Sequence, residues 1–362
     1  MLMLRKLRES VLVGGILIVV GCDQFNTTPP PSPPPPPPPL PPVTSTVPVA
    51  PATAAMATPM MEPEPPLPPE KTDDDIIDEF LSLNPQERTD EKLIEVSRLE
   101  RGVNRIRELS LKQSPVTEKG LQALAAFPRL VLLDLTECQI SDGALRELTF
   151  CKNIDTLILA NTPINNGGLI HVGQMERLRE LDLSGTAITD AGFVSLKRLP
   201  DLEVLHLDKN PYLLGREFNK LVESGAFSQL RILTVNDTRF SPQGLDSIQK
   251  LRRLEVFSGE NSGVTDGSLV NLGKCLQLRV LQLGRSPVTV LGMKKLNKLE
   301  SLEELGLHDC PGIADIAFNA LKSNVSLRKL DVTNTSCSEA AVMLLASKYL
   351  LDTDILYNNT TY

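Results

Sequence analysis

The sequence contains no tryptophan, and only 4% of its 362 residues are aromatic. A core must therefore be built mainly from aliphatic side chains, and a binding surface would have few of the aromatic anchors that dominate many protein interfaces. An excess of positive charge is also lacking, because 37 Lys and Arg stand against 45 Asp and Glu, for a net charge of −8. This balance argues against a nucleic-acid-binding protein, which normally carries a basic surface.

Residues that carry chemistry are equally scarce. The only histidines are His171, His206 and His308, and six cysteines in a chain of this length do not make a disulfide scaffold. No nucleophile elbow, phosphate-binding loop or metalloprotease motif is present. The sequence therefore predicts a protein that is not an enzyme, with no catalytic residue, no cofactor and no metal site.

Composition divides the chain into several parts. Residues 22–70 hold 20 of the 29 prolines and have no Gly, Lys or Arg. Polyproline stays extended because it cannot form the hydrogen bonds of helices or sheets, so we expect a disordered stalk here; a ligand for proline-recognition domains is the alternative. Residues 71–100 have a net charge of −6, whereas 101–362 hold equal numbers of acids and bases.

The N-terminus has the features of a secretory signal over residues 1–21. Arg5, Lys6 and Arg8 precede the apolar run at 11–20, which is too short to span a membrane comfortably; an uncleaved N-terminal anchor helix is the alternative. Val19-Val20-Gly21-Cys22 resembles the lipobox of bacterial lipoproteins. That resemblance implies cleavage before Cys22, lipidation of Cys22, and a lipid-anchored membrane protein of the bacterial cell envelope, facing the periplasm or the exterior. In lipoproteins of enteric bacteria, an Asp such as Asp23 implies retention at the inner membrane.

An internal repeat determines the predicted fold. Ten segments share the pattern L-x-x-L-x-L, and seven of the nine steps between them are 24 residues long. Positions 4 and 6 alternate with neighbours that we expect to be exposed, which is typical of a strand with one buried face. A Ser or Thr followed by an acid, as in Thr189-Asp190, then predicts the start of a short helix. The segments begin at Ile106, Leu130, Ile154, Leu178, Leu202, Leu230, Leu254, Leu278, Leu302 and Leu327.

These segments resemble the leucine-rich repeat family, in particular the 24-residue planctomycete-type repeats and the cysteine-containing repeats of F-box proteins. The resemblance implies an α/β solenoid, a horseshoe with a parallel concave β-sheet and outer helices, over residues 106–362. Residues 71–105 are expected to form a helical N-terminal cap, with helices starting at Thr72 and Thr89. Repeat 7 has Phe257 and Gly259 where leucine is usual, which predicts a weak point.

Two columns of the repeat carry specific expectations. Position 9 holds small hydroxyl and thiol residues, including Cys138 and Cys310, which we expect to hydrogen-bond to turn backbone. The other buried cysteines are expected to be core substitutes, not ligands or nucleophiles. Position 2 alternates in charge over eight repeats, which predicts either a cross-strand ion ladder or a recognition stripe; its members are Asp155, Arg179, Glu203, Arg231, Glu255, Arg279, Glu303 and Arg328.

Positions 3, 5, 7 and 8 are expected to face the concave side, where they are acidic and rich in hydroxyls. Asp182, His206 and Asp208 should converge, as either a metal site or a solvated polar patch. The predicted partner is a protein or peptide of basic character, and not nucleic acid; binding at an edge or on the convex side is the alternative. The candidate binding residues are Asp134, Glu180, Asp182, His206, Asp208, Asp237, His308, Asp309 and Asp331.

The function predicted from these features is a non-enzymatic protein–protein interaction module, anchored by lipid and displayed on the proline-rich stalk. Two other functions stay open. The resemblance to F-box proteins implies an adaptor in ubiquitin-dependent degradation, although no F-box-like segment is evident in 71–105. A self-associating envelope scaffold is the second.

Overall fold

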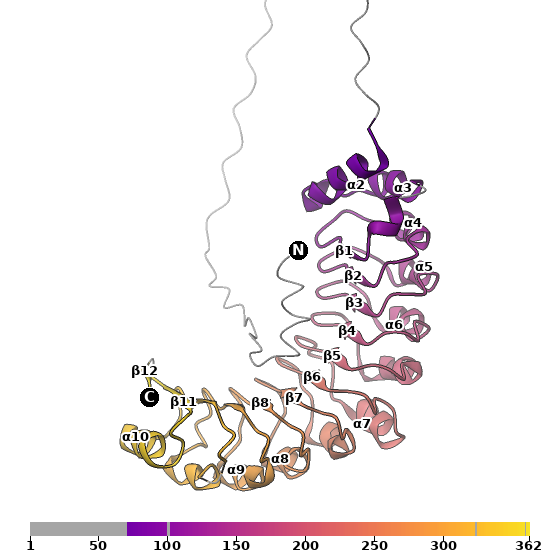
Figure 1. Cartoon of the computed structure of the whole chain (residues 1–362). Coiled ribbons are helices and arrows are strands. Elements are labelled where there is room, and N and C mark those ends of the chain that lie inside the picture. The colour runs from indigo at the N-terminus through magenta and orange to yellow at the C-terminus, as the bar shows by residue number, and fades with distance from the viewer. Residues whose placement is uncertain (1–70, 100–101, 323, 359) are drawn as a thin grey trace, which may run out of the picture. The chain divides into compact units, whose positions relative to one another are not determined.

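The computed structural model describes residues 71–99, 102–322, 324–358 and 360–362. The predicted signal segment, Cys22 and the proline-rich stalk lie outside the described residues. The described residues belong to one structural unit that extends to Tyr362, and its helices and strands are labelled as in Figure 1.

Two helices precede the repeats, where the sequence predicts a cap. Helix α2 spans Asp73–Ser82 and α3 spans Asp90–Ser97, joined by a 3-10 turn at Pro85–Glu87. Thr72 and Asp75 form a reciprocal capping box, which satisfies two backbone N–H groups at the start of α2. The helices bury Ile77, Phe80, Leu93 and Val96 in the same core as the first repeats.

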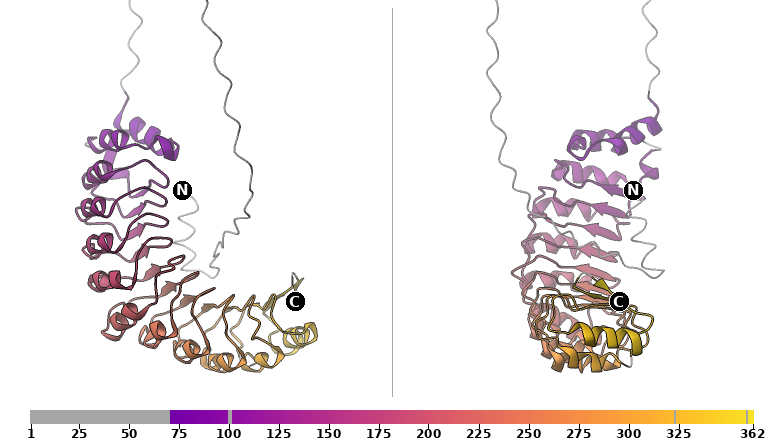
Figure 2. Two further views of the ribbon diagram at one scale, coloured as in Figure 1. Left: turned by 180° about the vertical axis from the view of Figure 1, so that it is seen from behind. Right: turned by 90° about the vertical axis from the view of Figure 1, so that its left-hand side faces the viewer.

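The repeats form one sheet, which has 12 strands within the described residues, ordered in space as in the sequence. The strands line the inner side of a curved array, and the helices lie on its outer side (Figures 1 and 2). Neighbouring strands are parallel up to β11, whereas β12 pairs antiparallel with β11, which corrects the expectation of a wholly parallel sheet. The strands β1 to β12 span Glu108–Ser110, Leu132–Asp134, Thr156–Ile158, Glu180–Asp182, Val204–His206, Ile232–Thr234, Val256–Ser258, Val280–Gln282, Glu304–Gly306, Lys329–Asp331, Asp354–Tyr357 and Thr360–Thr361.

The outer layer differs from the expected row of helices, because part of it is 3-10 helix. Most helical segments between consecutive strands are short, and 3-10 helix is used in such short pieces, whereas Asp190–Arg198 is a longer 3-10 segment of nine residues. The α-helices are α4 Glu118–Ala123, α5 Leu145–Leu148, α6 Asn166–Val172, α7 Arg216–Glu223, α8 Asp266–Leu272, α9 Val290–Met293 and α10 Glu339–Lys348. The 3-10 segments of the repeats are Gly102–Arg105, Leu124–Ala126, Asp142–Ala144, Asp190–Arg198, Pro242–Leu245, Ile248–Lys250, Leu296–Lys298 and Asp315–Ala320.

The Thr-Asp pairs at the helix starts join one repeat to the next. Asp266 accepts hydrogen bonds from the backbone N–H and the hydroxyl of Thr289, 23 residues further on. Asp190 accepts three backbone N–H groups at the start of α7, with distances of 2.9–3.0 Å. Glycines such as Gly292 leave space for these carboxylates, since a Cβ there would lie 2.3 Å from Asp266 Oδ1. The acid therefore connects repeats, in addition to the helix-capping role that the sequence suggests.

Position 9 closes the turn after each strand. The hydroxyls of Thr162, Thr186 and Thr238 donate to the carbonyl oxygen three residues before them, within their own repeat. Cys138 and Cys310 instead donate to the carbonyl oxygens of Leu111 and Leu283 in the preceding repeat. The expected bonding to turn backbone is confirmed for these five residues. The thiols bond to backbone of the preceding repeat, whereas the hydroxyls bond to backbone of their own repeat, and that of Thr186 also donates to the side chain of Asn210 in the next repeat.

The alternating charges of position 2 form ion pairs between neighbouring strands. Arg231 Nε lies 2.8 Å from Glu255 Oε1 and Arg231 Nη2 lies 2.9 Å from Glu255 Oε2, whereas the nearest oxygen of Glu203 is 3.8 Å from Arg231. Arg279 pairs with Glu303 in the same two-bond geometry, and Arg179 pairs with Glu203. The ladder interpretation is confirmed for these repeats, but each arginine pairs mainly with the glutamate of the following repeat.

Two repeats depart from the regular pattern, one in its length and repeat 7 in its core residues, and the structure accommodates each in a different way. The repeat that begins at Leu202 is four residues longer than most, since the next begins at Leu230. It accommodates the extra residues in the outer segment around α7, where Phe218 packs against Phe193, Phe227 and Phe240 with ring centroids 5.5–5.8 Å apart. In repeat 7 the fully buried ring of Phe257 extends into the space that a side chain at Gly259 would occupy. The larger residue thus compensates for the smaller one at the predicted weak point.

Candidate functional site

The strands decide which side chains can meet a partner. The middle residue of each strand points into the core, as Leu181 and Leu205 do, and both are fully buried. Because side chains alternate along a strand, the residues on either side of them point to the concave face. Positions 3 and 5 of the repeat, and position 7 in the following turn, therefore form columns across that face.

Asp182, His206 and Asp208 come close together, as the sequence predicts. Asp182 and His206 are paired positions of β4 and β5. His206 Nδ1 lies 3.0 Å from the hydroxyl oxygen of Thr234, which in turn donates to Asp208 Oδ2 at 2.8 Å. Asp208 Oδ1 accepts the backbone N–H of Asn236 at 2.7 Å. His206 and Asp208 are thus joined through Thr234, and Asp182 lies beside His206 at the paired position of β4.

Asp208 is the half-buried carboxylate that Thr234 and Asn236 hold in this hydrogen-bonded network. Burial raises the pKa of its carboxyl, because removal from water disfavours the charged form. The hydrogen bonds from Asn236 and Thr234 act in the opposite direction, as does the charge of a protonated His206, whereas the negative charge of Asp182 raises the pKa further. The hydrogen bonds around Asp208 therefore stabilise its charged form only in part.

This environment predicts a pH dependence of stability that Asp208→Asn should remove. A folded-state pKa above the unfolded value near 4 means that the folded chain binds the proton more tightly. Asp208 therefore stabilises the fold below about pH 4, and that contribution is lost as the pH rises through the raised pKa. Relative to the native protein, the asparagine variant should gain stability as the pH is raised over this interval, measured by urea unfolding at several pH values.

The matched control is Asp201→Asn, which removes one exposed carboxylate just before the same repeat. The free energy of unfolding of Asp201→Asn, relative to the native protein, should change less with pH than that of Asp208→Asn. If the stability of the two variants depends on pH in the same way, Asp208 does not make the predicted pH-dependent contribution.

A second group of charges lies near the C-terminal end of the sheet. Glu260, which is 7% exposed, has its Oε2 3.5 Å from Arg285 Nη2 and 3.6 Å from His308 Nε2. His308 Nδ1 lies 3.9 Å from Asp331 Oδ2. The histidine ring occupies space left by Gly284, where a Cβ would lie 2.1 Å from His308 Cε1. His308 and Asp331 are therefore brought together, with Glu260 and Arg285 added to them.

The other candidates lie apart from these two groups. Asp134 is largely buried and accepts hydrogen bonds from Ser110 and from the backbone and hydroxyl of Thr136. Glu180 is half-buried at the start of β4. Asp237 and Asp309 both have a positive φ, and each accepts a side-chain amide from the next repeat, Asn261 and Asn334 respectively. These two carboxylates therefore form part of the turn, beside the sheet.

With this geometry in view, comparisons with known proteins identify the architecture. A family model described as "Leucine Rich repeat" matches residues 177–197, within the repeat that contains Asp182. The described residues form a leucine-rich repeat solenoid.

Solved structures similar to this solenoid have low sequence identity to it. The TLR13 chain of a TLR13–ssRNA13 complex is 18% identical with a TM-score of 0.50, over 71% of this chain and 40% of that one. An internalin from Listeria monocytogenes is 15% identical with a TM-score of 0.42, over 75% of this chain and 95% of the internalin. A plant peptide hormone receptor, RGFR1 in complex with RGF2, is 17% identical with a TM-score of 0.41, over 69% of this chain and 49% of the receptor. No curated protein sequence matches the chain.

The solenoid's cysteines lie in its core. Cys138, Cys151, Cys275, Cys310 and Cys337 are buried and unpaired. Burial raises the pKa of Cys138 and Cys151 to about 11 and that of Cys275 to about 12. Since the thiolate is the reactive form, these cysteines have the properties of core residues.

Metal-binding clusters and membrane-spanning helices are both absent from the described part of the solenoid. Among the residues that the structure describes, no cluster of three or more His, Cys, Asp or Glu side chains has the arrangement of a metal site. Within the same residues, no helix has the length and apolarity needed to cross a membrane.

The sequence prediction missed several members of the concave groups. Thr234, Asn236 and Glu260 take part in the hydrogen bonds and ion pairs described above. All three occupy positions 5 or 7, so reading those columns in full would have found them. What the columns could not show is that Thr234 and Glu260 are buried.

Proposed function

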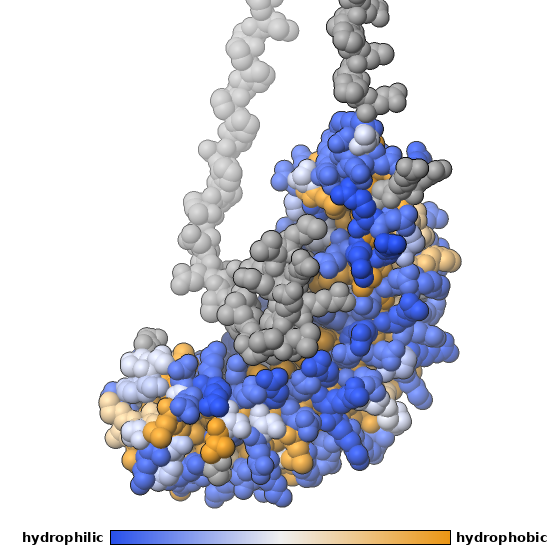
Figure 3. Space-filling model, viewed as in Figure 1, coloured by the Kyte–Doolittle hydropathy of each residue, from blue (hydrophilic) through white to orange (hydrophobic). Residues whose placement is uncertain are grey.

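We propose that this protein is a non-enzymatic interaction module that binds a protein or peptide partner of basic character on the concave face of its solenoid. The observation that supports the proposal is the set of half-buried carboxylates on that face, where Glu180 and Asp182 lie on β4 and Asp331 lies on β10. The side of the solenoid visible in Figure 3 is mostly hydrophilic along the repeats. Binding through the concave carboxylates would depend mainly on charge and hydrogen bonds.

The structure suggests which carboxylates to test. Asp182 and Asp331 each use one oxygen to accept a backbone N–H in their own turn, from Ser184 at 2.8 Å and from Thr333 at 3.0 Å. Asparagine can keep that hydrogen bond and removes only the charge. Asp208 is less suitable, because its substitution would also disturb the buried network.

The double variant Asp182→Asn/Asp331→Asn is expected to reduce capture of the partner several-fold. The experiment is photo-crosslinking capture from bacterial envelopes with the full-length protein, repeated at low and high salt, since screening should weaken the native interaction. The control, Glu176→Gln/Asp246→Asn, removes two exposed charges elsewhere. Unchanged capture by the concave variant would contradict the proposal.

We further propose that the chain is a lipoprotein, anchored through Cys22 and held away from the membrane by the segment at 22–70. The support is the order Val19-Val20-Gly21-Cys22 after a basic start and a short apolar run. Cys22→Ala should abolish labelling of the protein by radioactive palmitate in cells. Cys151→Ala is the control, since that buried thiol should not be a lipid acceptor; persistent labelling of Cys22→Ala would show that the anchor is wrong.

A further inference from the structure

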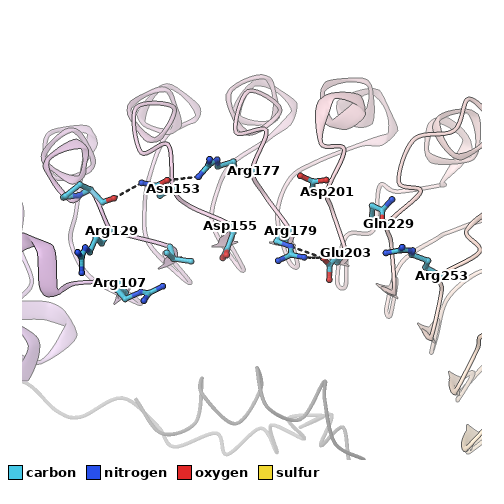
Figure 4. A pocket seen from close by; sticks show the side chains of 12 residues that line it. Arg107, Arg129, Asn153, Asp155, Arg177, Arg179, Asp201, Glu203, Gln229 and Arg253 are labelled. Carbon is cyan, nitrogen blue, oxygen red and sulfur yellow. Dashed lines mark hydrogen bonds and ion pairs between the residues drawn. The ribbon is translucent and has the colours of Figure 1, made fainter.

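A long groove crosses the side of the solenoid where the chain enters each strand. It has a volume of about 710 Å³ and runs from repeat 1 to repeat 7, lined by residues just before and after the first leucine of each repeat (Figure 4). We call it the strand-entry groove. Its arginines are Arg107, Arg129, Arg177, Arg179 and Arg253.

The groove is basic although the chain as a whole is acidic. Five arginines face three carboxylates, those of Asp155, Asp201 and Glu203, whereas the net charge of the chain is −8. Glu203 is already engaged, since it pairs with Arg179 and lies 3.8 Å from Arg231. The positive charge of the groove is therefore not balanced by its own acids.

Three of the arginines are available to a ligand. Arg107, Arg129 and Arg253 are exposed, and none of them makes a hydrogen bond or ion pair through its side chain with another described residue. Arg177 donates only to Asn153, whose amide in turn donates to the carbonyl oxygen of Pro128 (Figure 4). Guanidinium groups held at intervals along a groove are suited to bidentate recognition of carboxylates.

The lining favours a polypeptide over other anionic partners. Asp155 and Asp201 interrupt the row of arginines, which suits a ligand whose negative charges are separated by neutral residues better than a uniform chain of phosphates. No aromatic side chain lines the groove, so bases would have no stacking surface there. Its lining is also too polar for a typical small-molecule pocket, which is mostly apolar.

The length of the groove agrees with an extended segment. Six steps between neighbouring repeats, at about 4.8 Å each, span roughly 29 Å. An extended chain covers that distance with about nine residues. We propose that the strand-entry groove binds an extended acidic segment of a partner protein, with carboxylates facing Arg107, Arg129 and Arg253. This surface is separate from the concave face and does not depend on the function proposed for it.

The test is binding of a fluorescent peptide of alternating Glu and Ser, about ten residues long, to the full-length protein, measured by anisotropy. Arg107→Glu/Arg129→Glu/Arg253→Glu should weaken binding about tenfold or more, and added salt should weaken binding to the native protein. Lys119→Glu/Arg216→Glu/Arg239→Glu makes the same change of charge at exposed positions near the helix starts and should leave binding unchanged. If the triple glutamate variant does not fold, the same three arginines are changed to Gln.

The concave variant Asp182→Asn/Asp331→Asn should bind the peptide like the native protein, so failure of one proposal is distinguishable from failure of the other. No binding of the peptide, or equal loss in the groove and control variants, would overturn the proposal. So would an oligouridylate that binds more tightly than the peptide and displaces it, since the groove would then be a nucleic-acid site.

Discussion

Replacing Asn210 by leucine is expected to lower the free energy of unfolding by about 3 kcal/mol or more. Asn210 is fully buried, and its amide donates to the carbonyl oxygens of Leu183 at 2.8 Å and Leu207 at 2.9 Å. Its side-chain oxygen accepts both the backbone N–H and the hydroxyl of Thr186, each at 3.1 Å. Leucine has a similar size but leaves these groups of two repeats without their partner.

The control for Asn210 is Thr162→Val in the same column of the repeat. Thr162 is also buried, but its side chain makes one hydrogen bond, to the carbonyl oxygen of Leu159 at 2.7 Å. Losing this one hydrogen bond should lower the free energy of unfolding by about 1 kcal/mol. Urea unfolding of both variants gives the comparison. If Asn210→Leu costs no more than Thr162→Val, the bonds between repeats do not contribute as the structure suggests.

Gly259→Leu should destabilise the protein by about 3 kcal/mol, because it overfills repeat 7. A Cβ at Gly259 would lie 2.9 Å from Phe257 Cε1 and 3.0 Å from Val264 Cγ2, both in the closely packed core. Phe257→Leu should also be destabilising, since it leaves a cavity. The double variant restores the usual pair of leucines. Its loss in free energy of unfolding should therefore be smaller, by about 2 kcal/mol, than the sum of the losses of the two single variants.

Chemical denaturation of the two single variants and the double variant measures this coupling. Gly267→Ala serves as the control, because a Cβ at that position of α8 meets its nearest neighbour at an ordinary 3.5 Å. Alanine should be neutral or slightly stabilising there, since it is the better helix former. Additive effects of Phe257→Leu and Gly259→Leu would mean that the ring does not substitute for the missing leucine.

Much of the fold follows from the repeat alone. The spacing of the leucines predicts the strands, and β1 to β10 each lie two residues after the first residue of a predicted repeat, as Glu108 does after Ile106. Thr72 and Thr89 correctly mark the starts of α2 and α3. Patterns of this kind are readable because each repeat buries the same positions against its neighbours.

Other features could not be read from the pattern, because they depend on distances between repeats. The sequence shows alternating charges at position 2, but not that Arg231 lies closer to Glu255 than to Glu203. It shows Thr-Asp pairs, but not that Asp190 accepts three backbone N–H groups from the next repeat. Nor does the pattern show that Asp190–Arg198 forms a 3-10 helix where a short α-helix is expected.

For the candidate site, the sequence determined the residues and the structure decided their surroundings. The column positions of Asp182, His206 and Asp208 were sufficient to predict that they converge, since equivalent positions of parallel strands lie side by side. That Asp208 is half-buried against Thr234, that Glu260 joins His308, and that arginines without a side-chain partner among the described residues line one side of the solenoid all depend on packing between repeats. Burial and pairing are properties of neighbours that are 24 or more residues apart in the chain, so only the tertiary structure could decide them.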